Sequence, residues 1–214
     1  MAPIRVELSP TAATAVLTVR NQDDAPVVVQ ARPAAWSQQG DHEQLDDTRD
    51  LLVTPPLFTL APKSQQTVRI ALLHKPDPAR ELDYRLVLSE VPQAATADGT
   101  GLRIALRITL PVFVAPPVRA APDLLWQHRW LADGTLELQT QNRGNAHIQI
   151  LDFDVQSAEH PGQSLHADAA RYLLPGTLAH WELPGANTPR AGRVLIHGHS
   201  DTGDFSVTSD PGPQ

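Results

Sequence analysis

Nine histidines are the first candidates for chemistry in this chain of 214 residues. His197-Gly198-His199 would put two imidazoles on one side of a strand, because alternate residues of a strand share a face. A metal ion needs further ligands, and the other histidines considered are scattered through the second half of the sequence, at His147, His160, His166 and His180. The chain has no cysteine, which excludes thiolate ligands, thiol catalysis and disulfides. The sequence therefore favours surface histidines over a metal site.

Other arrangements of polar residues also fall short of a catalytic site. Ser200-Asp201 follows His199 directly, but a catalytic triad is recognised by geometry, and neighbours in a strand point apart. The carboxylate pairs Asp46-Asp47 and Asp152/Asp154 are of a kind common on protein surfaces. The chain has no glycine-rich phosphate loop. We expect no catalytic residue, no metal and no cofactor, and the chain is not predicted to be an enzyme.

The arginines of the first half suggest a binding site. Arg5 lies in the predicted first strand, Arg85 in a later strand, and Arg103 and Arg107 in the strand after that. If these strands are neighbours, their guanidinium groups could converge on a carboxylate, which guanidinium binds with two hydrogen bonds. The alternative is that each arginine is a separate, solvated side chain.

Composition limits the classes of protein. A net charge of −7 and a pI near 5.6 argue against nucleic-acid binding. No apolar run approaches the roughly 18 residues of a membrane-spanning helix, so we expect no membrane insertion. Twenty prolines favour many short strands over long helices. No signal peptide is recognisable at Met1-Ala2-Pro3.

The most regular stretch is Gly101 to Pro117, GLRIALRITLPVFVAPP. Such a strand can be the central strand of its own sandwich, or it can offer its apolar face to another protein. Every second residue is apolar, so these side chains share one face: Leu102, Ile104, Leu106, Ile108, Leu110, Val112 and Val114.

Short alternating segments with turn signals between them predict an all-β chain of two sandwich domains, 1–117 and 118–214. The predicted strands of the first are 3–9, 13–20, 27–36, 51–54, 65–73, 81–91 and 101–117. Gly40 to Asp50 is predicted to be an acidic loop. The predicted strands of the smaller second domain are 124–131, 134–142, 146–155, 171–174, 177–183, 193–197 and 204–208.

The order of motifs resembles the periplasmic chaperones of the chaperone–usher pathway of pilus assembly. The first half carries IRVELSP, VRNQDDAPVVVQ, LLVTPPLFTLAPKSQQTVRI, ELDYRLVLSEVP and LRIALRITLPVFVAPP. The second half carries LLWQ, DGTLELQTQNRGNAHIQILDF and YLLPGTLAHWEL. The resemblance covers residues 3–208.

The resemblance implies two immunoglobulin-like β-sandwich domains arranged as a boomerang with a cleft between them. It also implies a chaperone that binds fimbrial subunits in the periplasm and delivers them to an outer-membrane usher. Each subunit lacks a strand, and the chaperone's last strand of domain one supplies it, a form of strand addition. A periplasmic chain of this sequence would have lost its leader, and its exposed donor strand could let the free chaperone self-associate.

The resemblance also implies roles for residues. The donor residues are Leu102, Ile104, Leu106, Ile108 and, at the end, Leu110. Arg5 would anchor the C-terminal carboxylate of the subunit. The family's second cation, a lysine, falls on Thr109 or Pro111, so Arg85 or Arg107 is expected to replace it, with Arg103 a weaker candidate.

The ending LPVFVAP and the Tyr84-Arg85 pair suggest a non-classical branch, archaic or spore-coat-like. The alternative function is a structural or adhesive β-sandwich module, such as a fimbrial subunit or a carbohydrate-binding domain. Only ten aromatic residues (Phe, Trp and Tyr) are present, which disfavours a lectin. A strand predicted almost at the first residue disfavours a subunit, which would begin with a donor extension.

Overall fold

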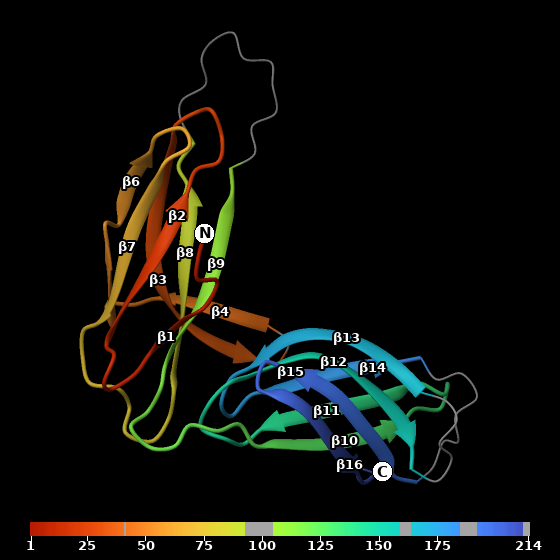
Figure 1. Ribbon diagram of the computed structural model, residues 1–214. Coiled ribbons are helices and arrows are strands. Elements are labelled where there is room, and N and C mark those ends of the chain that lie inside the picture. Colours follow the sequence, from red (N-terminus) through yellow and green to blue (C-terminus); the bar gives the residue numbers. More distant parts are fainter. Residues whose placement is uncertain (41, 93–104, 159–163, 185–191, 212–214) are drawn as a thin grey trace. The chain divides into compact units, whose positions relative to one another are not determined.

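A computed structural model describes residues 1–40, 42–92, 105–158, 164–184 and 192–211. The chain folds into two compact units, Met1–Ser37 with Gln44–Arg119, and Gln38–Glu43 with Ala120–Gln214. The described residues contain strands and turns but no helix, so the all-β prediction is confirmed (Figure 1). Within these residues there is accordingly no helix long and apolar enough to cross a membrane.

Unit 1 is built from two sheets (Figure 1). One sheet has the order β1-β9-β8-β3-β4, with β6 also paired to β3, and the other has the order β2-β7-β5. The strands are β1 (Val6–Leu8), β2 (Thr14–Arg20), β3 (Val27–Gln39), β4 (His42–Asp47), β5 (Leu51–Thr54), β6 (Leu57–Leu60), β7 (Gln65–Leu72), β8 (Leu82–Glu90) and β9 (Arg107–Val114).

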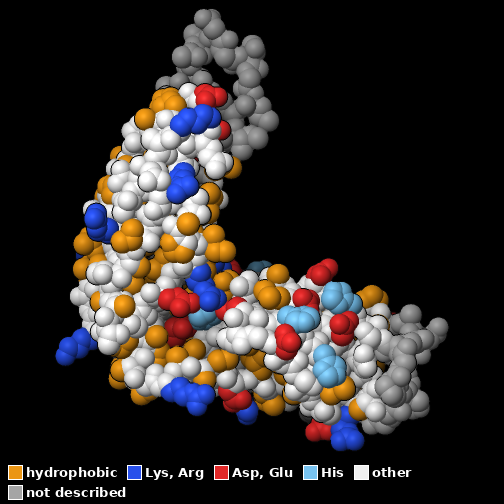
Figure 2. All heavy atoms as spheres, in the orientation of Figure 1, with side chains coloured by type: hydrophobic (Ala, Val, Ile, Leu, Met, Phe, Trp, Pro, Cys, Tyr) orange, Lys and Arg blue, Asp and Glu red, His pale blue; other side chains and the backbone are white. Residues whose placement is uncertain are grey.

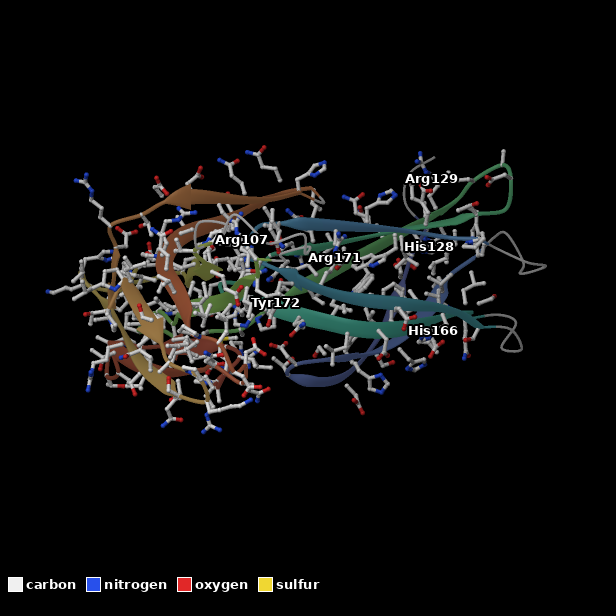
Figure 3. The ribbon with its side chains drawn as sticks, turned by 90° about the horizontal axis from the view of Figure 1, so that it is seen from above. Arg107, His128, Arg129, His166, Arg171 and Tyr172 are labelled. Carbon is white, nitrogen blue, oxygen red and sulfur yellow. The ribbon has the colours of Figure 1, made fainter. Side chains whose placement is uncertain are left out.

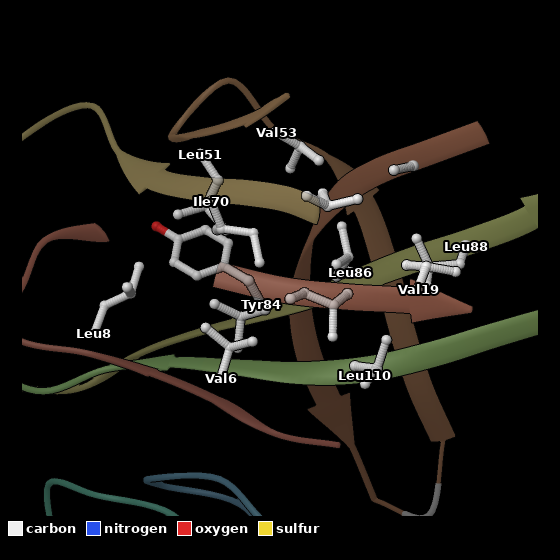
Figure 4. Close-up of a cluster of buried hydrophobic side chains, with 14 of the residues drawn as sticks. Val6, Leu8, Val19, Leu51, Val53, Ile70, Tyr84, Leu86, Leu88 and Leu110 are labelled. Carbon is white, nitrogen blue, oxygen red and sulfur yellow. The ribbon is translucent and has the colours of Figure 1, made fainter. Parts of the chain in front are cut away.

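The core of unit 1 follows the two-residue alternation of its strands (Figure 4). In β8, Tyr84, Leu86 and Leu88 face the core, and Leu110 and Val112 of β9 are directly opposite Leu86 and Tyr84. The Tyr84 hydroxyl donates a hydrogen bond to Asp50 Oδ2 at 3.0 Å, and burial raises the pKa of this hydroxyl.

Unit 2 also consists of two sheets, β10-β11-β14 and β13-β12-β15-β16. Its core contains Trp126, Phe153 and Trp181, whose rings contact one another. The strands are β10 (Leu124–Trp130), β11 (Leu136–Asn142), β12 (Ile148–Ser157), β13 (Ser164–Leu173), β14 (Leu178–Leu183), β15 (Val194–Ser200) and β16 (Gly203–Ser209).

Four details differ from the sequence-based expectation. Strand β6 was not among the predicted strands; its four residues lie between Pro55-Pro56 and Pro62. The predicted acidic loop at 40–50 contains strand β4, which pairs with β3; both strands expose polar residues there, so no apolar alternation marks them. Strand β13 is much longer than 171–174, because its buried side chains Ala167 and Ala169 are too small to give a strong apolar pattern. Arg5 lies directly before β1 rather than within it.

Each unit contains a buried asparagine at the end of its second strand. In unit 1, Asn21 Nδ2 donates to the carbonyl oxygens of Ala25 (2.8 Å), Leu60 (3.3 Å) and Ala61 (3.1 Å). Asn21 Oδ1 accepts from the Asp23 amide at 3.0 Å. One side chain therefore satisfies backbone groups of the following turn and of the end of β6.

Asn142 does the same in unit 2. Its Nδ2 donates to the carbonyl oxygens of Ala146 (2.8 Å) and Leu173 (3.1 Å). Its Oδ1 accepts from the amides of Gly144 (3.0 Å) and Asp123 (3.2 Å). A Cβ at Gly144 would lie 2.3 Å from the carbonyl oxygen of Ala121, so only glycine fits in this turn.

A second shared feature is the turn that each asparagine contacts. Asn21 N donates to Ser64 O at 2.9 Å, and Asn142 N donates to Thr177 O at 3.0 Å. The residue before Ser64 and the residue before Thr177 both have a positive φ, which is 55° at Lys63 and 80° at Gly176. We call each combination of buried asparagine and positive-φ turn the asparagine corner of its unit.

Candidate functional site

Strand β9 has two halves that differ in exposure. Leu110, Val112 and Val114 are at most 1% exposed and lie in the core of unit 1. Ile108 is directly opposite Leu88 of β8 and so lies on the same face, but it is 41% exposed, and Leu106 just before the strand is 55% exposed. The apolar face of β9 therefore continues beyond the part of the sandwich that covers it.

The backbone of β9 shows the same division. Strand β8 pairs with β9 from Arg107 to Val114, along one edge. On the other edge, β1 pairs with β9 in parallel, and this pairing extends only from Val112 to Val114. Among the described residues, the segment from Arg107 to Leu110 is therefore an edge with backbone groups available to another strand.

The exposed side chains line a pocket of about 330 Å³ at one end of unit 1. Leu106 and Ile108 belong to its lining, and Arg20, Asp23 and Glu90 are among its polar lining residues. The apolar lining also includes Met1, Val19, Val27, Val29, Leu60 and Leu88. Of these residues, only Leu106 and Ile108 were predicted to bind a partner, because the other apolar lining residues of the strands alternate like ordinary core positions.

The predicted donor residues are only partly described. Leu102 and Ile104, like Arg103, lie outside the described residues. Leu106 and Ile108 are exposed, whereas Leu110 is 1% exposed and packs in the core of unit 1.

The register brings two of the predicted arginines together. Arg85 of β8 is directly opposite Pro111 of β9, and Val6 of β1 is opposite Val112, so Arg5, one residue before Val6, comes level with Pro111. Arg5 and Arg85 thus flank Pro111, about two strand spacings or roughly 10 Å apart. Arg107 lies four residues from Pro111 along β9, roughly 13 Å away.

The three arginines also differ in their surroundings. Arg5 has a side chain that is 32% exposed and forms an ion pair with Glu7 at 3.0 Å. The guanidinium of Arg85 lies 3.6 Å from the ring centroid of Trp36, which is a cation–π contact, and Arg85 is 8% exposed. Arg107 is exposed, and it lies opposite Ser89 at the start of β9 (Figure 3).

Unit 2 collects histidines and aspartates on one face of the sheet β13-β12-β15-β16 (Figure 2). His166 Nδ1 lies 3.2 Å from Asp154 Oδ1, and its Nε2 lies 3.4 Å from Asp168 Oδ1. The hydrogen bond with Asp154 raises the pKa of His166 above its ordinary value.

His199 is held in the same way on this face. Its Nδ1 lies 2.6 Å from Asp152 Oδ1, and its Nε2 lies 3.8 Å from Asp204 Oδ1. The hydrogen bond with Asp152 raises the pKa of His199. A Cβ at Gly198 would lie 2.5 Å from the Phe205 ring, so the glycine of the His-Gly-His motif allows close packing in the core.

His128 is different, because it is 3% exposed. Its Nε2 lies 3.1 Å from the carbonyl oxygen of Gly192, and its Nδ1 lies 3.0 Å from Ser209 Oγ. A carbonyl only accepts, so Nε2 carries the proton and Nδ1 accepts from the hydroxyl. Burial lowers the pKa of His128 and so favours its neutral form.

Comparison with known proteins agrees with this fold and strand arrangement. Over residues 1–119 the sequence matches the family described as pili and flagellar-assembly chaperone, PapD N-terminal domain. No curated protein matches the sequence.

Several solved structures are similar over almost the whole chain. One is the CsuC–CsuE chaperone–tip adhesion subunit pre-assembly complex of the archaic Csu pili of Acinetobacter baumannii, with 17% identity, 99% of this chain and 97% of the other covered, and a TM-score of 0.72. Another is the CupB2 chaperone of Pseudomonas aeruginosa, with 21% identity, 97% of each chain covered and a TM-score of 0.63. A third is the SafA pilin in complex with the SafB chaperone from Salmonella enterica, with 19% identity, 95% and 92% covered and a TM-score of 0.64.

At these identities the similarity establishes a shared fold. The prediction of two immunoglobulin-like β-sandwiches is thereby confirmed. Because the family match spans residues 1–119 of 214, which is more than half of the sequence, the chain belongs to the family of pilus and flagellar-assembly chaperones.

Proposed function

We propose that this protein is a periplasmic chaperone that binds fimbrial subunits through the N-terminal half of β9 and the residues before it. The observation that carries the proposal is the exposed continuation of an apolar strand face, with Ile108 41% and Leu106 55% exposed beside a strand edge that β1 leaves open. The family match favours this function over a structural or adhesive module.

The proposed mode of binding is donor-strand complementation. A subunit strand would add to the β9 edge between Arg107 and Leu110, where hydrogen bonds to the backbone are available, and Leu106 and Ile108 would fill an apolar groove in the subunit. Leu102 and Ile104, which continue the apolar alternation in the sequence, are proposed as further donor residues. Each fully buried side chain of this type contributes about 1.5–3 kcal/mol before the costs of ordering are subtracted.

Arg5 and Arg85 are the proposed anchor for the subunit's C-terminal carboxylate. They flank Pro111 on neighbouring strands, so a carboxylate above Pro111 could contact both. Arg5 is the more accessible of the two, and Arg107, roughly 13 Å away along the strand, would make a separate contact.

The wider pathway is part of the same proposal. The CsuC–CsuE and SafB–SafA structures are complexes of a chaperone with a subunit, and we extend that partnership to this chain. Delivery to an outer-membrane usher and the absence of enzymatic activity follow from the proposed role. The self-association expected of the free chain remains a prediction.

Strand β9 itself offers a matched test of donor-strand binding. The protein is co-expressed in a bacterial periplasm with the fimbrial subunit that it captures in a pull-down, and co-purification is measured. Ile108→Asp should abolish co-purification, whereas Thr109→Asp, on the opposite face of the exposed half, should retain most of it. Equal binding by wild type and Ile108→Asp, with both folded by circular dichroism, would refute the proposal.

The anchor is tested in the same assay. Arg5→Ala should weaken subunit binding more than Arg107→Ala does, and Arg85→Ala should weaken it as well. Unchanged affinity in Arg5→Ala would show that the carboxylate binds elsewhere while leaving the donor strand intact.

A further inference from the structure

Glu137, His180 and Glu182 bring three potential metal ligands together on unit 2. One ligand atom of each side chain lies within 4.8 Å of the others. Glu137 of β11 and Glu182 of β14 are directly opposite each other, and His180 lies two residues from Glu182 on the same face. We call these three residues the β11–β14 triad.

The distances in the triad are close to those of a coordination shell. His180 Nε2 lies 3.5 Å from Glu137 Oε1 and 3.7 Å from Glu182 Oε1. A tetrahedral ion with bonds of about 2.0–2.2 Å separates neighbouring ligand atoms by about 3.3–3.6 Å. The two distances from His180 Nε2 to the carboxylate oxygens therefore need only small changes to fit an ion. Glu182, whose side chain is 66% exposed, has room to adjust.

A neighbouring arginine fixes the orientation of one ligand. Arg129 of β10 lies opposite Glu137, and its Nε donates to Glu137 Oε2 at 2.7 Å. This contact occupies one carboxylate oxygen and leaves Oε1 directed toward His180. Hydrogen bonding of a ligand by an outer residue is a regular feature of metal sites.

The charges also favour a cation. Like charges directly opposite each other on neighbouring strands destabilise the pair, and Glu137 and Glu182 are such a pair. Arg129 forms an ion pair with Glu137 and so offsets one of the two negative charges. A divalent ion between the carboxylates would offset the other charge.

We propose that the β11–β14 triad binds Zn²⁺. One imidazole and two carboxylates are zinc ligands, whereas calcium and magnesium prefer oxygen ligands alone. The ion would join β14, at the edge of its sheet, to the central strand β11. The site belongs to unit 2 and does not depend on subunit binding.

The histidine–aspartate face of the other sheet is the natural control. In His166 and His199, each ring nitrogen faces its own aspartate, so the two carboxylates are on different sides of the ring. Figure 3 shows His166 and Arg129 on opposite sides of unit 2. A zinc ion bound by the triad should therefore be insensitive to substitution of His199.

The test uses the full chain without an affinity tag, freed of metal with a chelating resin. Isothermal titration with ZnCl₂ should show one ion per chain, and Co²⁺ should give the intense visible absorption of a site with few ligands. His180→Gln should abolish binding, and Glu182→Gln should weaken it at least about tenfold. His199→Gln should bind zinc like the wild type.

A second measurement reports the position of the ion. Zinc should slow hydrogen exchange of the amides in β14 (Leu178–Leu183) in the wild type but not in His180→Gln. The proposal is overturned if zinc binds equally to wild type and His180→Gln, if His199→Gln alone loses it, or if no saturable binding is seen.

Discussion

The two units share the asparagine corner and differ at their edges. In both, the side chain of a buried asparagine forms hydrogen bonds with backbone groups of the following turn and of a distant strand end. The backbone N–H of each asparagine donates to a second turn, at Ser64 O or Thr177 O. In unit 2, Ser209 of the last strand bonds His128 of the opposite sheet and links the two sheets. In unit 1, β9 leaves Ile108 exposed. The same asparagine corner therefore occurs in two different sandwiches. In unit 2 the last strand links the two sheets, and in unit 1 the strand β9 has an exposed apolar end.

The largest expected effect separates the two halves of β9. Leu110→Ala removes a side chain that is 1% exposed and should lower the free energy of unfolding of unit 1 by about 2–5 kcal/mol. Ile108→Ala should lower it by less than about 1 kcal/mol, because that side chain is already 41% exposed. Urea unfolding followed by circular dichroism measures both. Equal losses would mean that β9 is covered along its whole length.

Replacing the asparagines tests whether the two corners are equivalent. Asn21→Ala and Asn142→Ala each leave backbone carbonyl and amide groups without their partner and should each cost about 1–3 kcal/mol. Hydrogen exchange with mass spectrometry would assign each loss to its own unit. A large loss at one position and none at the other would break the equivalence.

Substitutions in the turns of the two corners should have smaller and unequal effects on stability. Gly176→Ala puts a side chain at a φ of 80° and should cost about 1 kcal/mol, because L-residues avoid this conformation. Lys63→Gly relieves the same strain at 55° but loses the contacts of Lys63 with Gln22 and Asp24, so its net change should be close to zero. Thermal unfolding of both variants provides the measurement, and a stabilised Gly176→Ala would contradict it.

The smallest effects concern pH and involve unit 2. The pKa of His128 is lowered in the folded state, so the unfolded chain binds its proton first and this contribution to stability is lost as pH falls below about 6.5. The pKa values of His166 and His199 are raised, so their contribution is present at low pH and disappears as pH rises through the folded values. The two groups oppose each other.

Substitution can separate these opposing contributions. The double variant His166→Gln/His199→Gln should lose stability more steeply than wild type between pH 7.5 and pH 5, roughly the range in which histidine titrates. Urea unfolding at a series of pH values measures the slope. A shallower slope in the double variant would reverse the assigned signs.

Much of the fold followed from alternation in the sequence. The face of β9 was predicted correctly because large apolar residues occupy every second position from Leu106 to Val114. Strand β4 was missed because its residues are exposed and polar apart from the half-buried Leu45, and most of β13 was missed because its buried positions there are alanine. A two-residue pattern needs a contrast in side-chain size and polarity.

The site was less accessible to sequence reasoning. The expected strands and the family resemblance made Arg5, Arg85 and Arg107 candidates, but only the register shows that Arg5 and Arg85 come level with Pro111. The β11–β14 triad combines residues from distant parts of the sequence, Glu137 and the pair His180 and Glu182, and His180 was set aside as scattered. Ligands contributed by different strands become neighbours only through pairing, which one sequence does not reveal.

The short parallel pairing of β1 with β9 has a consequence for any partner. Because β1 already occupies the β9 edge from Val112 onward, an added strand must stop before that residue. Strand β1 therefore limits how far an added strand can extend along β9 toward its C-terminal end. A strand that paired with β9 at Val112 or beyond would have to displace Val6 to Leu8, two of whose side chains, Val6 and Leu8, lie in the core of unit 1.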